Sequence, residues 1–372
     1  MYVEFLVAMC AAVLTSVAAC RLVMAAGVVD EPTIPRKMHK TPTPTPTSGG
    51  IGIATGFAVG VCILLMPPVQ TWSRDYTMDA ATRMAATAAA AILFFVIGVF
   101  DDLKPMRARE KMIVFILGAL AAALLVGKPD NLPIGAGAVI PLHFWGAVIG
   151  AALWVFVVVN AVNFLDGANG LSMGSVAIGL ICLAIIALDG GARGAAALSM
   201  CGAAALIGFL FWNFPAGRLF AGDSGALFAG GLAAAASLLA VQRGGVSPFT
   251  VATLFLPLVA DALLTLFWRA TKARELFDGH RDHIYQIALR AGWPHKRVTY
   301  HYWVSMMVCG LIAVAAHILA RGMILPLEFR GGELEDALTY APFLSFVCLL
   351  LPCVLIFRKT RRYAKQAGLD AP

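Results

Sequence analysis

Long apolar stretches alternate with short polar segments along the whole chain. Each stretch is roughly 17–25 residues long, the length of α-helix that crosses a hydrocarbon core about 30 Å thick. The pattern predicts an all-α, polytopic integral membrane bundle of about eleven transmembrane helices, with ten as the alternative. The eleven stretches are 3–26, 49–69, 80–100, 112–127, 143–162, 171–189, 195–213, 224–241, 248–268, 301–320 and 340–357.

Composition agrees with a membrane protein. Hydrophobic residues make up 60% of the 372 residues and charged residues 13%, with a mean hydropathy of +0.82. A soluble domain is about half apolar and about a quarter charged. We therefore interpret residues 1–372 as a single transmembrane catalytic domain rather than a soluble domain with an anchor.

Positive charge predicts the orientation, because Lys and Arg gather in cytoplasmic loops. With the N-terminus outside and the C-terminus inside, the cytoplasmic side holds 21 of the 28 Lys and Arg residues. The net charge of +7 therefore needs no nucleic-acid partner. The basic tail, 358–372, is interpreted as an anchor beside anionic lipid. The predicted cytoplasmic loops are 30–48, 101–111, 163–170, 214–223 and 269–300.

Polar and acidic residues cluster where four of the stretches meet this predicted cytoplasmic face. Taken singly, Asp102 could cap the following helix, Asp166 could form a turn, Asp223 could begin a helix, and the histidines could lie in a solvated loop. A common membrane face for all four favours one site instead. The segments are "GVFDDLK" (98–104), "NAVNFLDGANGL" (160–171), "NFPAGRLFAGDSGALFAGG" (213–231) and "FDGHRDHIYQ" (277–286).

The residue types in these segments indicate phosphate chemistry. Carboxylates are hard oxygen ligands that suit Mg²⁺, with Mn²⁺ as an alternative, and Lys104 and Lys111 would offset their charge. Basic and histidine side chains suit a diphosphate. A carboxylate-held metal at a membrane boundary suggests phosphoryl transfer between a soluble nucleotide and a lipid phosphate. The acids are Asp101, Asp102, Asp166 and Asp223, and the donors are His280, Arg281 and His283.

These motifs, in this order over roughly residues 30–300, resemble the polyprenyl-phosphate N-acetylhexosamine-1-phosphate transferases of glycosyltransferase family 4. "RKMHKTPTPTPTSGG" is similar to the family's first cytoplasmic loop and "DDLK" to its aspartate pair. "NAVNFLDGANGL" resembles the NxxNxxDGxxGL signature, and "HRDHIYQ" the histidine loop. The resemblance implies transfer of a sugar-1-phosphate from a UDP-sugar to undecaprenyl phosphate with release of UMP.

The histidine loop also suggests a subgroup. The consecutive histidines of the peptidoglycan-precursor branch are absent, and the loop is more similar to bacterial enzymes that start O-antigen, lipopolysaccharide or other surface glycans from UDP-GlcNAc or a deoxy-HexNAc analogue. The resemblance implies a multi-pass protein of the bacterial inner membrane, with a homodimer as a further expectation. Asn169 departs from the family's DGxDG turn, which leaves the nucleotide preference less defined.

The resemblance also implies roles for individual residues. Asp223 would bind Mg²⁺ together with Asp166. The catalytic set would be Asp101, Asp102, Asp166, His280 and His283, with one of the aspartate pair accepting a proton from the lipid phosphate. The substrate-binding set would be Lys111, Asn163, Asn169, Asn213, Phe220 and Arg281.

Three alternatives stay open at this stage. A secondary transporter for an anionic solute would place ionisable residues near the midplane, often with internal repeats, whereas here only Asp261 lies deep in a stretch. We interpret Asp261 as a structural partner rather than a catalytic group. Within the family, the alternative is the phospho-MurNAc-pentapeptide transferase. A relative that keeps the fold but has lost the activity is the third.

Overall fold

The computed structural model describes residues 2–27, 45–66, 78–275, 280–322 and 332–369. Helices dominate these residues, with one two-stranded hairpin. The elements are α1 (Tyr2–Ala25), α2 (Gly49–Leu65), α3 (Met78–Leu103), α4 (Ala108–Val126), β1 (Asn131–Gly135), β2 (Ala138–Pro141), α5 (Phe144–Phe164), α6 (Leu171–Asp189), α7 (Arg193–Asn213), α8 (Gly222–Gly244), α9 (Pro248–Leu254), α10 (Leu256–Thr271), α11 (Ile284–Arg290), α12 (His295–Ala320), α13 (Glu333–Leu338) and α14 (Ala341–Gln366).

In the described residues, each of the eleven predicted stretches lies mainly on helix, which confirms the all-α membrane class. Among the described residues, eight helices are long and apolar enough to cross a membrane, and the bent pair α9 and α10 can count as a ninth. Helix α2 is apolar but shorter, at 17 residues. Helix α4 has 19 residues, and its first turn is charged.

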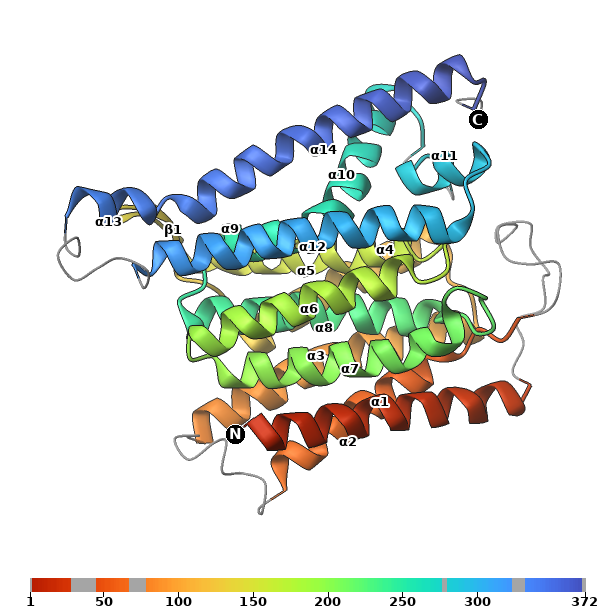
Figure 1. The fold of residues 1–372 in the computed structure, drawn as a ribbon, viewed down its shortest axis with the longest axis horizontal. Coiled ribbons are helices and arrows are strands. Elements are labelled where there is room, and N and C mark those ends of the chain that lie inside the picture. The colour runs from red at the N-terminus through yellow and green to blue at the C-terminus, as the bar shows by residue number, and fades with distance from the viewer. Residues whose placement is uncertain (1, 28–44, 67–77, 276–279, 323–331, 370–372) are drawn as a thin grey trace.

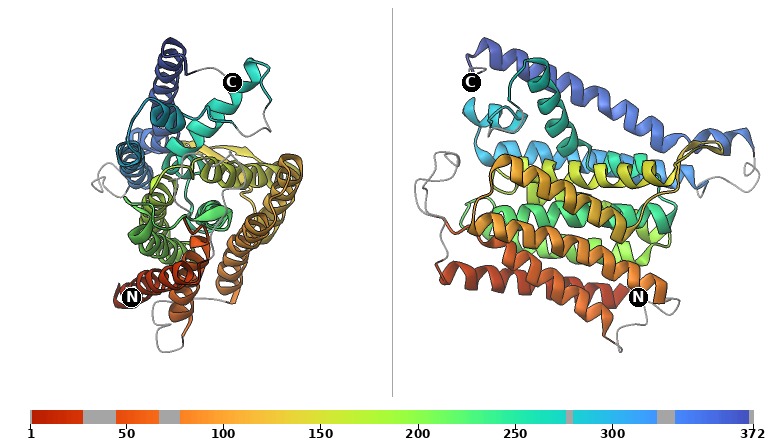
Figure 2. Two further views of the ribbon diagram at one scale, coloured as in Figure 1. Left: turned by 90° about the vertical axis from the view of Figure 1, so that its right-hand side faces the viewer. Right: turned by 180° about the vertical axis from the view of Figure 1, so that it is seen from behind.

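The antiparallel bundle runs back and forth between two ends, and the N- and C-terminal ends of the chain lie at opposite ends of it (Figure 1). Helices α3, α5 and α7 finish at the end where α4, α6 and α8 begin; we call this the site end. Helices α1 and α2 lie on one side of the bundle, and α14 lies on the other (Figures 1 and 2).

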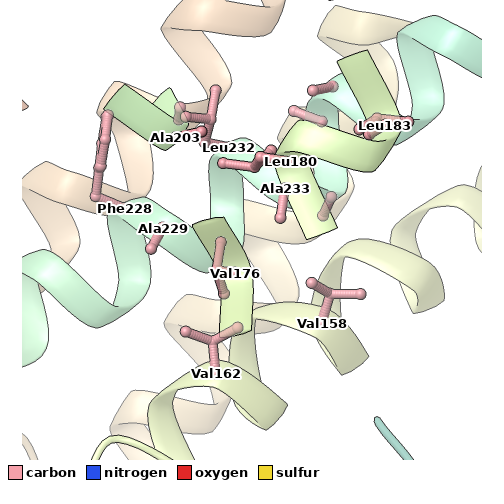
Figure 3. Close-up of a cluster of buried hydrophobic side chains, with 14 of the residues drawn as sticks. Val158, Val162, Val176, Leu180, Leu183, Ala203, Phe228, Ala229, Leu232 and Ala233 are labelled. Atoms are coloured by element: carbon pink, nitrogen blue, oxygen red, sulfur yellow. The ribbon is translucent and has the colours of Figure 1, made fainter. Parts of the chain in front are cut away.

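Helix α8 forms the centre of the bundle, and almost all of its residues are buried. Its sequence is rich in Ala and Gly, and small side chains let neighbouring helices approach closely. Leu232 and Ala233 of α8 pack with Val158 of α5 and Leu180 of α6 in the apolar core (Figure 3). The centre of the fold therefore places the first turn of α8 in the middle of the site end.

Three boundaries differ from the sequence prediction. The stretch 248–268 is not one span, because α9 and α10 meet at an angle of 83°. Pro257 lies in the first turn of α10, where proline is tolerated but cannot continue a preceding helix. The predicted loop 269–300 contains α11 and the first turn of α12, and α14 continues to Gln366 through most of the basic tail.

Other parts of the prediction have no counterpart to compare. Residues 30–44 of the predicted loop 30–48, and 277–279 of the histidine segment, lie outside the described residues. The β1–β2 hairpin joins α4 to α5 at the end opposite the site; its short strands were not predicted.

Candidate active site

Lys111 joins two of the predicted acidic residues at the site end. Its ammonium group is paired with the carboxylate of Asp101 at the end of α3, and it lies 3.1 Å from Oδ2 of Asp223 in the first turn of α8. Asp101 is almost fully buried, at 4% exposure. A buried carboxylate is costly without a partner, so the cation explains how the two acids can lie together. Lys104, in contrast, is exposed, and its role as a second cation stays a prediction.

Asp102 has a different partner from its neighbour. Its Oδ1 accepts the backbone N–H of Asp223 at 2.8 Å, and its Oδ2 accepts that of Ser224 at 2.9 Å. The first amides of a helix have no partner within the helix, and a carboxylate there is favoured by the helix dipole. Asp102 therefore caps α8, and not the helix that follows it in sequence.

This capping requires α3 and α8 to touch through their backbones. A Cβ atom on Gly98, one turn before the acidic pair, would lie 2.4 Å from Cα of Ser224. Gly222 has φ +73°, and a Cβ atom there would lie 2.8 Å from Oδ2 of Asp102. Glycine at both positions lets the two helices bring their charged ends together.

Asn163 brings the second motif to the same cluster. Its side-chain N–H donates to Oδ1 of Asp223 at 2.9 Å, so the carboxylate of Asp223 is held by Lys111 on one oxygen and Asn163 on the other. The Asp223 side chain is 30% exposed. Asp223 therefore does not act as the N-cap of α8 but presents its carboxylate to the site.

Asp166 lies in the turn between α5 and α6, where its Oδ1 accepts a 2.5 Å hydrogen bond from the hydroxyl of Ser172. It also lines a small pocket that brings together two of the four predicted motif segments, 160–171 and 213–231. The pocket is lined by Asp166, Gly167, Ala168, Asn169, Asn213, Phe220 and Ala221. Three residues of the predicted substrate-binding set (Asn169, Asn213 and Phe220) thus share one pocket with a predicted catalytic acid.

The two amides of this pocket also hold its walls. The Asn213 side chain accepts from the N–H of Gly170 at 2.6 Å and donates to the carbonyl of Leu219 at 2.8 Å. The Asn169 side chain donates to the carbonyl of Pro215 at 3.1 Å. The turn after α5 and the turn after α7 are therefore fixed to each other before any ligand binds.

The histidine segment packs on the second motif through an aromatic residue. The ring of Phe164, next to Asn163 in sequence, lies 5.5 Å from the His283 ring and 6.2 Å from the His280 ring. The hydroxyl of Tyr285 donates to the carbonyl of Phe164 at 3.0 Å. The structure thus brings the histidines to the α5 end, while Arg281, between them, is exposed.

The environment of His280 keeps its ring neutral at ordinary pH. Burial, together with the nearby charges of His283 and Arg269, lowers the pKa of His280 to about 3. His280 is therefore suited to donate or accept a hydrogen bond as a neutral imidazole, rather than to offer a fixed positive charge to a phosphate.

Asp261 is buried within α10 and binds the start of α11. Its Oδ1 accepts the N–H of Ile284 at 3.0 Å and lies 3.5 Å from Nδ1 of His283, while its Oδ2 accepts the hydroxyl of Tyr302 at 2.5 Å. The interpretation as a structural partner agrees with these contacts. They also connect Asp261 directly to a predicted catalytic histidine.

The carboxylates at the site end fit a Mg²⁺ site that uses only a few protein ligands. Within the described residues, no three His, Cys, Asp or Glu side chains are grouped as a metal cage. Mg²⁺ often takes only one or two carboxylates, with water and substrate phosphates as its other ligands. Asp223 and Asp101 supply such carboxylates on both sides of Lys111. The shared metal role of Asp166 stays a prediction.

Comparison with known proteins identifies the family. Residues 84–241 match the sequence model of glycosyl transferase family 4. A probable undecaprenyl-phosphate N-acetylglucosaminyl 1-phosphate transferase of Bacillus subtilis is 27% identical over 303 residues, 79% of this chain and 78% of that protein. A phospho-N-acetylmuramoyl-pentapeptide-transferase of Desulforudis audaxviator is 30% identical over 318 residues, 77% of this chain and 87% of that protein. The chain belongs to the polyprenyl-phosphate N-acetylhexosamine-1-phosphate transferase family.

Another relative of the transferase is the decaprenyl-phosphate N-acetylglucosaminephosphotransferase of Mycobacterium tuberculosis. It is 28% identical over 333 residues, which cover 82% of this chain and 81% of that protein. The region matched by the family model contains Asp101, Lys111, Asn163 and Asp223, and it ends before the histidine segment. The acidic cluster of the transferase therefore lies within the family's common region.

Sequence reasoning missed several residues that hold the site. Ser172 and Tyr302 lie in apolar helices, where a single hydroxyl gives no signal of its partner. Arg269 and Arg361 were counted only as part of the positive-inside bias, although both are buried. Only Gly98 gave a readable signal, since a glycine one turn before an acidic pair indicates close backbone approach.

Proposed function

We propose that this transferase moves a HexNAc-1-phosphate from a UDP-sugar, UDP-GlcNAc or a deoxy-HexNAc analogue, to undecaprenyl phosphate and releases UMP. The reaction would be the first membrane step of a cell-surface polysaccharide such as O-antigen. An oxygen of the lipid phosphate forms a bond to the β-phosphorus of the UDP-sugar. The bond from that phosphorus to the bridging oxygen breaks, and UMP leaves with the bridging oxygen.

The observation that carries this proposal is the bridge from Lys111 to both Asp101 and Asp223. Phosphoryl transfer depends mainly on positioning and on the electrostatic stabilisation of charge. Lys111 supplies a fixed cation where two anionic reactants would meet, and Asn163 fixes the Asp223 carboxylate from the other side. Capping by Asp102 holds the first turn of α8, and so the carboxylate of Asp223, against α3.

Asp223 and Asp101 are the residues that would hold Mg²⁺, with Asp166 as a further candidate; Mn²⁺ is the alternative ion. A bound metal would offset phosphate charge and stabilise the leaving group. The pocket beside Asp166, with Phe220 and the amides of Asn169 and Asn213, is the proposed uridine site. His280, His283 and Arg281 are proposed to face the diphosphate and the sugar.

We further propose that the site end faces the cytoplasm of a bacterial inner membrane, because the basic loops and the C-terminal end of α14 lie there. UDP-sugars are cytoplasmic metabolites in this scheme, and the lipid phosphate would enter from the bilayer. Accessibility labelling of single cysteines placed at exposed Arg109 and at exposed Val139 would test the orientation. Labelling of the residue-109 site from the outside of intact cells would contradict it.

The test of the reaction is an assay with the purified full-length protein in nanodiscs. The protein would receive undecaprenyl phosphate and a panel of UDP-N-acetyl sugars, with mass spectrometry of the lipid product and measurement of UMP. We expect UMP release that requires both the lipid phosphate and Mg²⁺. Turnover only with UDP-MurNAc-pentapeptide would instead support the second activity found among the relatives. Counterflow of labelled solute without UMP release would support a transporter.

A further inference from the structure

The segment that carries the two histidines is held by side chains rather than by regular secondary structure. Residues 280–283 precede α11 and belong to no helix or strand. The carbonyl of Arg281 accepts from Nη2 of Arg290 at 2.7 Å, and the carbonyl of Asp282 accepts from Arg361. The N–H of His283 donates to Oε1 of Gln286 at 3.2 Å. The position of the histidines therefore depends on which side chains reach this backbone.

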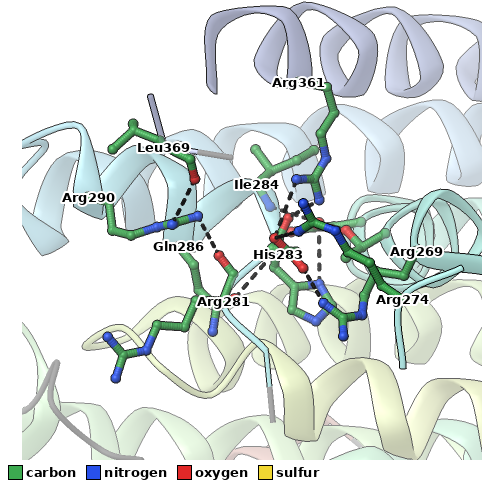
Figure 4. A network of polar contacts seen from close by, with 12 residues as sticks. Arg269, Arg274, Arg281, His283, Ile284, Gln286, Arg290, Arg361 and Leu369 are labelled. Carbon is green, nitrogen blue, oxygen red and sulfur yellow. Dashed lines mark hydrogen bonds and ion pairs between the residues drawn. The ribbon is translucent and has the colours of Figure 1, made fainter. Parts of the chain in front are cut away.

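A largely buried group of charges surrounds Asp282 within that segment; Figure 4 labels its three arginines, Arg269, Arg274 and Arg361. Its Oδ2 pairs with Nη1 of Arg269, and its Oδ1 lies 3.7 Å from both Nη1 of Arg274 and Nη1 of Arg361. The side chains of Asp282, Arg269 and Arg361 are each only 8% exposed. Burial alone would raise the pKa of Asp282, but Arg269 and Arg361 lower it overall. The ionised carboxylate of Asp282 thus contacts three arginines and connects them to the segment 280–283.

Arg361 is the member of this group that comes from the C-terminal end of α14. Its guanidinium lies 3.7 Å from the ring centroid of Trp268 in α10, and the adjacent Arg362 is exposed. Phe357, Arg361 and Ala364 form one buried face of α14, at helical spacing. The interpretation of the basic tail as only a lipid anchor is therefore wrong for Arg361.

A second contact joins the same chain end to the same segment. Arg290, at the end of α11, donates to the carbonyl of Leu369 at 2.9 Å through Nη1 and to that of Arg281 through Nη2. Arg290 therefore links the C-terminal end of the described chain to the histidine segment. Arg290 of α11 and Arg361 of α14 therefore both connect the C-terminal end of the described chain to the histidine segment.

We propose that Arg361 is a positioning residue for the reaction: it holds Asp282 so that His280 and His283 face the sugar-nucleotide side of the site. The assignment rests on the proposed function. Loss of the guanidinium would leave the buried carbonyl of Asp282 without its donor and its carboxylate with one cation fewer, which favours rearrangement of the segment. The cluster of Lys111, Asp101, Asn163 and Asp223 is built by α3, α4, α5 and α8. Arg269 and Arg361 come from α10 and α14, so we expect the contacts of the lipid phosphate with that cluster to be little affected.

The test compares Arg361→Gln, Arg361→Lys and the exposed control Arg362→Gln in the full-length protein in nanodiscs. Hydrogen exchange of peptides covering 280–290 is measured alongside steady-state kinetics. For Arg361→Gln we expect exchange in this region to rise about 10-fold while α6 and α8 stay protected. We expect the KM for the UDP-sugar to rise about 10-fold and that for undecaprenyl phosphate to stay within about twofold. Arg361→Lys should recover part of both effects, and Arg362→Gln should match the wild type.

Two results would overturn the assignment. One is unchanged exchange at 280–290 in Arg361→Gln. The other is a general rise in exchange across α6 and α8 with equal changes in both KM values, since that indicates only a loss of global stability. If the wild-type protein turns over no UDP-sugar, the proposed function fails, and the exchange measurement alone then decides whether Arg361 holds the segment.

Discussion

The carboxylate of Asp102 receives the backbone N–H of Asp223 at 2.8 Å, across 121 positions of sequence. Its neighbour Asp101 instead pairs with Lys111 and accepts the N–H of Met106 at 2.8 Å. The adjacent residues Asp101 and Asp102 thus have different structural roles. One fixes the helix that carries Asp223, and the other lies beside the cation that Asp223 also contacts.

Replacing Asp102 by Ala should destabilise the protein, because two amides at the start of α8 lose their acceptor. The loss of a helix cap costs about 1–2 kcal/mol, and thermal unfolding followed in nanodiscs measures it. Asp102→Asn should cost less, since an amide oxygen can still accept one N–H. The exposed Asp336→Asn serves as the control. Unchanged unfolding of Asp102→Ala would mean that the cap contributes nothing to stability.

Replacing Lys111 by Met should leave Asp101 and Asp223 without their shared cation. Turnover should fall by at least about 10²-fold, the scale found when a preorganised electrostatic partner is removed. Lys111→Arg should keep part of the activity, and Arg109→Gln, an exposed residue in the same first turn of α4, should keep nearly all of it. Equal activity of Lys111→Met and Arg109→Gln would show that the contacts of Lys111 with Asp101 and Asp223 do not contribute to the reaction.

Asp223→Ala should reduce turnover by at least about 10²-fold if this carboxylate holds the metal. Asp223→Asn keeps the size of the side chain and tests the charge. Titration of the residual activity with Mg²⁺ separates metal binding from other effects, since a metal ligand should raise the concentration needed for half-maximal activity. Near-normal turnover in Asp223→Ala would reject the central site assignment.

Asp261→Ala should destabilise the link between α10 and α11, because Ile284 and Tyr302 both lose their acceptor. Buried hydrogen-bonding groups without a partner cost about 1–3 kcal/mol each. Tyr302→Phe removes one of these contacts alone, so a double-mutant cycle measures whether the two residues act together. Strict additivity of the two changes would argue against the contact.

Acidification should destabilise the histidine segment. Burial first, and then His283 and Arg269, lower the pKa of His280 to about 3 in the folded protein, whereas an unfolded histidine has a pKa of about 6.5. The unfolded state therefore takes up a proton first, and the stability present above about pH 6.5 is lost as the pH falls toward 3. His280→Gln should show a smaller drop in melting temperature between about pH 7.5 and about pH 5. An identical drop in both proteins would contradict this.

The local pattern of hydrophobic residues determined the class of this protein. A helix in a bilayer must satisfy its own backbone, so apolar length alone predicts a span, and the stretch that became α3 could be recognised without its neighbours. The acidic motifs were also visible, because charge at the end of an apolar run is conspicuous. Pro257 even marked the break between α9 and α10, although the stretch 248–268 was predicted as one span.

Only the tertiary structure decided which partner each of the charged residues contacts. Three contacts join residues far apart in sequence. Asp102 caps α8, Lys111 contacts both Asp101 and Asp223, and Arg361 in the basic end of α14 contacts Asp282. Hydropathy is a property of each segment, whereas a hydrogen bond depends on which helices lie side by side and how closely. Small residues such as Gly98 allow that close approach, and the resulting packing of α3 on α8 brings Asp102 to the backbone of Asp223.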